Sequence, residues 1–255
     1  MTLHPSTLLA HPAYEVSDPD APGPWVVTCD HATNAVPEWL GGDLGLRPGD
    51  MERHIAYDIG AAGLARGLAR RLESPAVLTR FSRLVIDPNR GEDDPTLLMR
   101  LYDGTVIPAN RHAGPEELEQ RLDRLYRPYH DALGALLASR PDPAVLAIHS
   151  FTPQLRGRPP RPWHLAVLHS PQDQRLAQPV LRRLKEEPDL FVGDNEPYSG
   201  HLPGDSIDRH ALRPGRLNVL LEFRQDLAAT PAQQEAWADR LAPLLHDALQ
   251  EARHA

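Results

Sequence analysis

The stretch "PWVVTCDHATNAVP", from Pro24 to Pro37, changes from apolar residues to polar ones at Asp30, His31 and Asn34. A short apolar run rich in β-branched side chains predicts a strand that is covered on both faces. The polar residues stand where this strand would end. In parallel α/β sheets, ligands bind beyond the carboxyl ends of the strands. The stretch therefore indicates both a fold class and the place of a functional site.

The same alternation of patterns runs along the chain. Short β-branched runs alternate with segments in which leucine recurs every three or four residues, which is typical of an α/β domain with a mainly parallel sheet. Strands are predicted at 25–29, 76–80, 83–87, 144–149, 165–170 and 218–223. Helices are predicted at about 53–72, from Leu118 to Leu137 and from Trp237 to Leu249. No change of composition divides the chain, so residues 1–255 are expected to form a single domain.

Composition excludes several classes of protein. The formal net charge of -8 opposes binding to nucleic acid or to an anionic membrane surface, since both need a positive protein surface. The N-terminus lacks a basic region followed by a long apolar stretch, so no secretory signal is predicted and a cytoplasmic location is expected. Cys29 is the only cysteine, which excludes an internal disulfide. Because Lys185 is the only lysine, positive charge resides on guanidinium groups, which bind carboxylates through paired hydrogen bonds.

Histidines at two predicted strand ends suggest a metal site. His31 and His149 would converge at one edge of a parallel sheet, and two imidazoles with one carboxylate form a common zinc-binding set that leaves a position open for water. Asp58 is the preferred third ligand, because it shares an inward stripe of the predicted 53–72 helix with His54. His54 itself and Asn34 remain alternatives as ligands or neighbours of the site.

Each of these residues also has a purely structural interpretation. A histidine at a strand end can simply hydrogen-bond a loop, and His54 with Asp58 could form an internal ion pair. A nucleophilic hydrolase would use Cys29 or Ser150, but the sequence contains no G-x-S-x-G motif. Nucleotide binding has no support either, since neither a Walker loop nor G-x-G-x-x-G occurs. A pocket that binds an anionic small molecule without catalysis is a further alternative.

Six motifs together resemble the N-formylglutamate amidohydrolase family. They are "CDHATNAVP", "RHIAYDIGAAGLARGLA", "FSRLVIDPNR", "LYDGTVIPANR", "AIHSFTP" and "VLLEFRQD", and the resemblance extends over a core of about 24–250. It implies a three-layer α/β/α domain with a mixed, mainly parallel sheet, similar to zinc carboxypeptidases. It also implies one Zn²⁺ or another divalent ion, an N-acyl amino acid substrate such as N-formyl-L-glutamate, and a role in histidine degradation. Leucine-rich helix faces could serve a homodimer as readily as a core.

The resemblance assigns roles to individual residues. His31 and His149 match metal-binding histidines, Glu222 matches a strand-borne glutamate that activates water, and Asp58 falls at an acidic position of the helical motif. The resemblance implies that Arg83, Asn89, Arg90 and Arg209 bind the substrate. His54 and Asn34, as neighbours of the site, are expected to contact the substrate as well. Arg83 and Arg90 could instead pair with Asp87 or Asp93. The "HATN" segment departs from the H-S-G seen in members of the family that act on formylglutamate, so the acyl group and the amino acid stay open.

Overall fold

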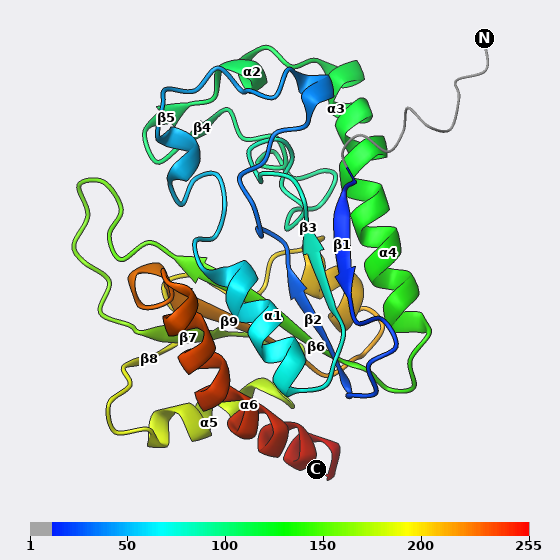
Figure 1. The fold of residues 1–255 in the computed structure, drawn as a ribbon, viewed down its shortest axis with the longest axis vertical. Helices are drawn as coiled ribbons and strands as arrows, with labels where there is room; N and C mark the ends of the chain where they lie inside the picture. Colours follow the sequence, from blue (N-terminus) through cyan, green and yellow to red (C-terminus); the bar gives the residue numbers. More distant parts are fainter. Residues whose placement is uncertain (1–11, 255) are drawn as a thin grey trace.

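A seven-stranded sheet forms the centre of the computed structural model, which describes residues 12–254 (Figure 1). The strand order is β1-β3-β2-β6-β9-β7-β8. Strands β3, β2, β6 and β9 are parallel to one another, whereas β1 pairs antiparallel with β3 and β7 pairs antiparallel with β9. The strands are β1 (Tyr14–Ser17), β2 (Trp25–Cys29), β3 (Ala76–Thr79), β6 (Ala144–Phe151), β7 (Leu165–Leu168), β8 (Val192–Asp194) and β9 (Asn218–Arg224), and a separate hairpin joins β4 (Leu101–Tyr102) to β5 (Thr105–Val106). The expected mixed, mainly parallel sheet is confirmed.

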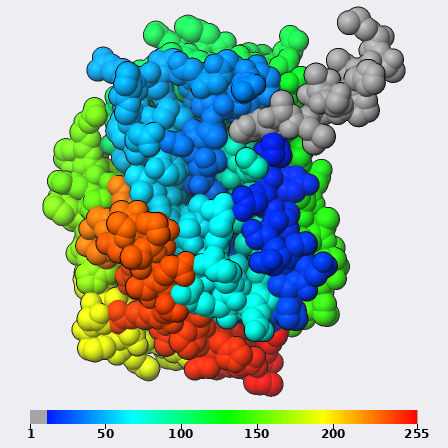
Figure 2. Space-filling view, in the orientation of Figure 1, coloured from blue at the N-terminus to red at the C-terminus, as the bar shows by residue number. Residues whose placement is uncertain are grey.

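Helices cover both faces of the sheet, which gives the expected three layers. Alternate residues of the central strands point to opposite sides, so each strand contributes to two apolar cores. One core packs against α1, α5 and α6, and Figure 2 shows α1 and α6 side by side on the molecular surface. The other core packs against α4 and the long loops. The helices are α1 (Ala61–Arg71), α2 (Pro108–Arg111), α3 (Pro115–Arg121), α4 (Arg127–Ala138), α5 (Ala177–Glu186) and α6 (Pro231–His254), with π-helical turns at Leu122–Tyr126 and Asp208–Leu212 and 3-10 turns at Glu38–Leu40, Asp50–Glu52 and Gln225–Leu227.

Five of the predicted strands are confirmed, one with its predicted end points and the others with an end point that shifts by one or two residues. The long helical patterns are also found, as α6 and as the succession of α3, a π-helical turn and α4. The short strands β1, β4, β5 and β8 and the helices α2 and α5 were not predicted. Within residues 12–254, no helix has both the length and the apolar character that crossing a bilayer requires.

The predicted helix at 53–72 is wrong in its first part. Helix α1 begins only at Ala61, because the preceding Gly60 has φ +84°, a left-handed conformation that no right-handed helix can include. A Cβ at Gly60 would lie 2.1 Å from the carbonyl oxygen of Ala228, so the chain also passes too close to its neighbour for a side chain. Asp58 therefore lies in a turn before the helix, not on a helical stripe.

The predicted strand at 83–87 is also wrong, although all five of its residues are buried. The segment forms a turn, and the backbone N–H of Val85 donates to the carbonyl of Ser82 at 2.9 Å. Side chains satisfy its carbonyl groups in place of a neighbouring strand: Asn110 Nδ2 donates to Leu84 O and Arg121 Nη1 donates to Val85 O, both at 2.7 Å. The apolar composition of this segment thus predicted correctly that it is buried, but predicted incorrectly that it is a strand.

Candidate metal and catalytic site

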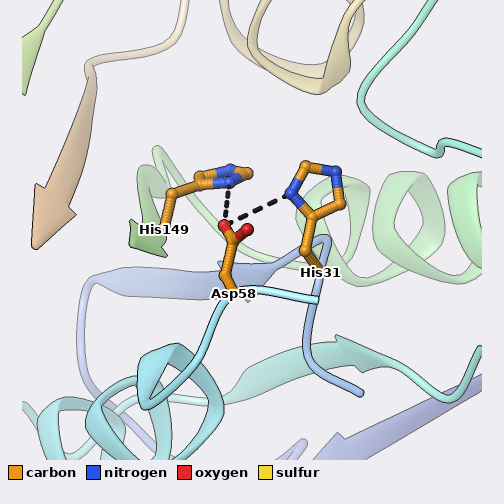
Figure 3. Close-up of side chains that lie close together, drawn as sticks. All are labelled: His31, Asp58 and His149. Atoms are coloured by element: carbon orange, nitrogen blue, oxygen red, sulfur yellow. Dashed lines mark hydrogen bonds and ion pairs between the residues drawn. The ribbon is translucent and has the colours of Figure 1, made fainter. Parts of the chain in front are cut away.

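Three buried side chains meet above the carboxyl ends of β2 and β6. His31 follows β2, His149 lies in β6 and Asp58 lies in the turn before α1. Both imidazoles direct Nδ1 toward the same carboxylate oxygen, Asp58 Oδ2, at 3.3 Å for His31 and 2.9 Å for His149 (Figure 3). One nitrogen or oxygen atom of each residue lies within 4.8 Å of the others, which is close enough for a single ion to be shared.

Backbone contacts fix the position of Asp58. Its N–H donates to the carbonyl oxygen of His31 at 2.9 Å, so the turn is attached to the end of β2. Its Oδ2 accepts the N–H of Ser150 at 3.2 Å, which attaches the carboxylate to β6. The neighbouring left-handed Gly60 then starts α1 at once. Asp58 thus lies beside the two histidines as predicted, but it is held there by a turn and by hydrogen bonds to β2 and β6, not by a helix.

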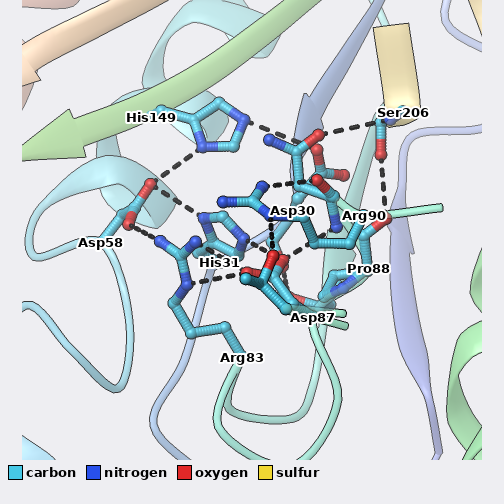
Figure 4. A network of polar contacts seen from close by, with 12 residues as sticks. Asp30, His31, Asp58, Arg83, Asp87, Pro88, Arg90, His149 and Ser206 are labelled. Atoms are coloured by element: carbon cyan, nitrogen blue, oxygen red, sulfur yellow. Dashed lines mark hydrogen bonds and ion pairs between the residues drawn. The ribbon is translucent and has the colours of Figure 1, made fainter. Parts of the chain in front are cut away.

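The far nitrogen of each imidazole faces a second carboxylate (Figure 4). His31 Nε2 lies 2.8 Å from Asp87 Oδ1, and His149 Nε2 lies 3.5 Å from Asp30 Oδ2. A carboxylate at Nε2 favours the tautomer with a hydrogen there, which leaves the Nδ1 lone pair for a metal. Asp30 also accepts a hydrogen bond from the hydroxyl of Tyr129. A carboxylate at Nε2 therefore orients each histidine, as is common for histidines that bind a metal through the other ring nitrogen.

Electrostatics keep the acidic groups of this cluster ionised. Burial alone would raise the pKa of Asp30, Asp58 and Asp87, but positive partners outweigh burial in each case. The charges of His31 and His149 hold the pKa of Asp58 well below its usual range, and the Arg83 guanidinium does so most strongly for Asp87. Conversely, the neighbouring carboxylates of Asp30 and Asp58 overcome burial and hold the pKa of His149 well above its usual 6.5.

A divalent cation fits this donor set. The cluster contains three ionised carboxylates and one buried guanidinium, that of Arg83, so with neutral imidazoles it has an excess of two negative charges. Buried charge of one sign needs compensation, either by protons on the imidazoles or by a cation. Two imidazole nitrogens and one carboxylate oxygen are also the ligand types that zinc takes in hydrolytic sites. The residues that are present therefore match the expected group in both chemistry and charge.

Glu222 stands beside this cluster on the next strand. It lies in β9 directly opposite His149 in the parallel register. Its Oε2 is buried and has no hydrogen-bond partner among residues 12–254. Burial, reinforced by the charge of Asp58, raises the pKa of Glu222 to about 7. A carboxyl group with this pKa can exchange a proton near neutral pH, as a general base and acid must.

A cavity of about 230 Å³ opens over these residues. Its wall includes four of the predicted substrate-binding residues, which are His54, Arg83, Asn89 and Arg90. Arg83 forms an ion pair with Asp87 at 2.7 Å, which is the structural role that the sequence suggested as the alternative to substrate binding. Arg83 nevertheless borders the cavity. Arg90 donates only to neutral oxygens, Thr96 Oγ1 and Asn89 O, and has no ion-pair partner in the described part of the chain.

Two predicted residues lie outside the cavity wall. The Asn34 amide donates to the carbonyl oxygen of Met51 at 2.8 Å. Arg209 stacks on the ring of Tyr126 and donates to its hydroxyl at 3.0 Å. That hydroxyl in turn donates to the carbonyl oxygen of Arg90 at 2.6 Å. The structure therefore links the Arg209 side chain to the cavity through the loop that carries Arg90, and the Arg209 backbone through Asp205, whose carbonyl oxygen accepts the Arg209 N–H at 2.9 Å.

The nucleophilic alternative finds no support in the geometry. Cys29 is fully buried, and burial raises the pKa of its thiol well above the ordinary value, which disfavours the reactive thiolate. Ser150 borders the cavity, but its hydroxyl donates to the carbonyl oxygen of Ile59 at 2.8 Å rather than to a base. A serine nucleophile needs such a base within hydrogen-bond reach.

Sequence patterns did not assign a role to the carboxylates behind the histidines. Asp30 was singled out with His31 at the strand end, but its contact with His149 was not predicted. Asp87 had been expected only as a possible partner for an arginine, and its contact with His31 depends on the turn at 83–87. Asp205 lines the cavity and gave no signal in the sequence; burial raises the pKa of its carboxyl to about 7.

Comparison with known proteins shows similarity to one protein family and to proteins of known structure. The family model described as N-formylglutamate amidohydrolase matches residues 23–229. A gene product of Agrobacterium tumefaciens of known structure has 34% sequence identity and a TM-score of 0.90, with 96% of this chain and 98% of that chain covered. An N-formylglutamate amidohydrolase from Ralstonia eutropha has 21% identity and a TM-score of 0.71, which shows a likeness in fold, with 96% and 100% covered. A search of curated proteins finds no match.

Proposed function

The chain belongs to the N-formylglutamate amidohydrolase family, whose members hydrolyse amide C–N bonds, and from this premise we propose that its substrate is an N-acyl derivative of an acidic amino acid. N-formyl-L-glutamate is the first candidate, because the family and the Ralstonia eutropha relative are described by that activity. The observation that carries the proposal is the buried Glu222 carboxyl, without a hydrogen-bond partner among the described residues, next to a cluster able to hold a metal.

In this proposal His31, His149 and Asp58 hold one divalent cation, with Zn²⁺ as the first choice. When bound, the cation would supply Lewis acidity, which polarises the acyl carbonyl group and makes water more acidic. Asp87 and Asp30 keep the two imidazoles in the tautomer and orientation that binding requires. Arg83 compensates the charge of Asp87 and holds it in place with two hydrogen bonds.

Glu222 is the proposed catalytic residue. Its ionised carboxylate takes a proton from water as the water oxygen forms a bond to the acyl carbon. The same carboxyl then gives this proton to the amide nitrogen as the C–N bond breaks, so that a carboxylic acid and a free amino acid leave. A pKa of about 7 suits both transfers, because neither protonation state is strongly favoured at neutral pH.

Arg90 and Asn89 are the proposed groups that orient the substrate. The guanidinium of Arg90 has no carboxylate partner among the described residues, so a substrate carboxylate can supply one. His54 borders the same cavity and is a further proposed contact. Arg209 would act indirectly, by supporting the Arg90 loop through Tyr126, and Asn34 by holding the turn that precedes His54.

Two measurements on the purified protein test this function. The first is metal content, together with loss of activity on treatment with a chelator and recovery on addition of Zn²⁺. The second is hydrolysis of a panel of N-formyl, N-acetyl and longer N-acyl amino acids, followed by release of the free amino acid. Turnover of N-formyl-L-glutamate in a metal-dependent manner is the expected result. Binding of these compounds without any product would refute the catalytic proposal and favour a binding protein.

The Glu222→Gln variant tests the proposed base. It preserves the size of the side chain and the donor set of the metal, so bound metal should be unchanged while kcat falls by about 10²–10⁴-fold. Glu196→Gln is the matched control, since Glu196 is exposed and lies outside the cavity wall. Full activity of Glu222→Gln would remove Glu222 from the mechanism and leave the family assignment intact.

The proposal also includes the expectation from the sequence that the chain forms a single domain. Residues 1–255 are proposed to act as one catalytic domain, since a single seven-stranded sheet runs through the described part of the chain. A cytoplasmic location, a homodimer and a place in histidine degradation stay predictions.

A further inference from the structure

His201 borders the cavity but has no part in the proposed chemistry. It lies in the loop after β8, and its ring is half-buried. Its Nδ1 is 3.0 Å from the hydroxyl oxygen of Ser170. Its Nε2 has no hydrogen-bond partner among residues 12–254. One nitrogen is therefore held by the protein, and the other is available to a molecule in the cavity.

The surroundings of Ser170 determine which nitrogen of His201 carries the hydrogen. Ser170 is fully buried, and its oxygen accepts the backbone N–H of Gln172 at 3.1 Å. Within the described residues, the only acceptor left for the hydroxyl hydrogen is Nδ1 of His201. A buried hydroxyl group that does not donate is costly, so the neutral imidazole accepts at Nδ1 and carries its hydrogen on Nε2. His201 thus presents an N–H donor.

The loop that carries His201 is held firmly on both sides. On one side, Asn195 Oδ1 accepts the N–H groups of Gly200 at 3.1 Å and His169 at 2.9 Å. A Cβ at Gly200 would lie 2.1 Å from the His169 nitrogen, so the loop packs directly on the chain that follows β7. On the other side, the N–H of Ser206 donates to Asn89 Oδ1 at 3.3 Å. The donor is therefore positioned before any ligand binds.

Sheet register places this donor away from the reacting end of the cavity. Glu222 and Leu220 are two residues apart in β9 and both line the cavity, so the cavity follows the strand for about 7 Å. Leu168 pairs with Leu220 at the far end of that distance, and Ser170, which contacts His201, comes two residues after Leu168, past the end of β7. His201 accordingly faces the part of a substrate that is remote from the scissile amide.

On these grounds we infer that His201 donates its Nε2–H to an oxygen of the distal carboxylate of the substrate. The inference rests on the proposed function, because it takes the ligand to be an N-acyl acidic amino acid. Ser170 itself is not a nucleophile in this arrangement, since it is fully buried and does not border the cavity.

The test compares three variants in steady-state kinetics with N-formyl-L-glutamate. His201→Leu removes the donor and should raise KM by at least about tenfold while kcat changes little, because a contact remote from the reacting bond acts on binding. His201→Gln places an amide N–H near the position of Nε2 and should largely restore KM. His246→Leu is the control, since His246 is exposed on α6 and does not border the cavity.

The ring nitrogens of His201 give a readout that does not depend on turnover. Nitrogen-15 chemical shifts of the neutral imidazole should report hydrogen on Nε2 in the wild type, and Ser170→Ala should remove this preference. Hydrogen on Nδ1 in the wild type would overturn the inference, as would a His201→Leu variant with unchanged KM or with its loss confined to kcat. A wild type that hydrolyses no N-acyl amino acid would overturn the proposed function and this contact with it, whereas an active wild type with an unaffected His201→Leu variant would overturn the contact alone.

Discussion

Asp87→Asn separates the support of the metal ligands from the ligands themselves. Asp87 is fully buried, and its carboxylate accepts from His31 Nε2 at 2.8 Å, from the N–H of Asn89 at 2.9 Å and from Arg83 Nη2 at 2.7 Å. Asparagine has nearly the same shape but no charge, and it has only one acceptor oxygen. Whichever way its amide turns, its NH₂ group must face a donor.

Two effects of different size follow from these contacts. Arg83 loses its main ion-pair partner, and the one carboxylate left to it among the described residues is that of Asp58, with Oδ1 at 3.6 Å. Breaking a buried ion pair lowers the unfolding free energy by about 3–5 kcal/mol. Because the amide oxygen of asparagine can still accept one of the hydrogen bonds, we expect a loss near the lower end, about 3 kcal/mol. For a chain of this size such a loss lowers Tm by roughly 6–12 °C. His31 also loses its orienting carboxylate, which should weaken metal binding by about 10–100-fold.

The assay combines thermal unfolding with calorimetric titration of Zn²⁺ into chelator-treated protein. Asp93→Asn is the control, since it makes the same chemical change at an exposed position close by in the same loop. We expect the control to match the wild type in Tm and in metal affinity. An Asp87→Asn variant that binds Zn²⁺ within about twofold of the wild type would refute the role of Asp87 in orienting His31.

Two further predictions concern stability. Burial lowers the pKa of His210 to about 4, below the usual 6.5 of an unfolded chain, so the contribution of His210 to stability is complete above pH 6.5 and is lost as the pH falls toward 4. In urea unfolding measured against pH, His210→Gln should therefore remove about 3 kcal/mol of the loss in unfolding free energy at acid pH. A variant with the pH profile of the wild type would contradict this prediction. Gly60→Ala, whose Cβ would meet the Ala228 carbonyl oxygen, should lower the unfolding free energy by about 2 kcal/mol or more and reduce activity by displacing Asp58. Gly41→Ala has φ +83° and open space, so it should cost only about 1 kcal/mol; equal losses in the two variants would contradict the steric explanation.

Much of the sheet could be predicted because its strands are buried on both faces. A strand such as β6, in which every residue is buried, produces a continuous apolar run that periodicity detects. The edge strands β1 and β8 are short and partly exposed, so they lack this signal. The apolar run at 83–87 gave a false signal for the same reason, since Asn110 and Arg121 satisfy the backbone of a buried turn from distant parts of the chain.

The candidate site divides in a similar way. His31, His149 and Glu222 could be predicted because they lie at or just after the ends of strands, and neighbouring parallel strands bring their carboxyl ends together at one edge of the sheet. The position of Asp58 depends instead on a left-handed glycine and on a hydrogen bond to the end of β2. Neither feature has a period that a sequence pattern can report.

The sequence by itself determined the layered α/β architecture, the family and the residues at the strand ends, because burial, periodicity and motifs are local properties of the chain. Only the tertiary structure decided which side chains from other segments contact these residues and the cavity beside them. Asp87 supports His31 across 56 positions of sequence, and Ser170 holds His201 across 31. Such contacts depend on how turns and loops fold against the sheet, and their energies arise only when charges and hydrogen-bonding groups from separate segments are buried together.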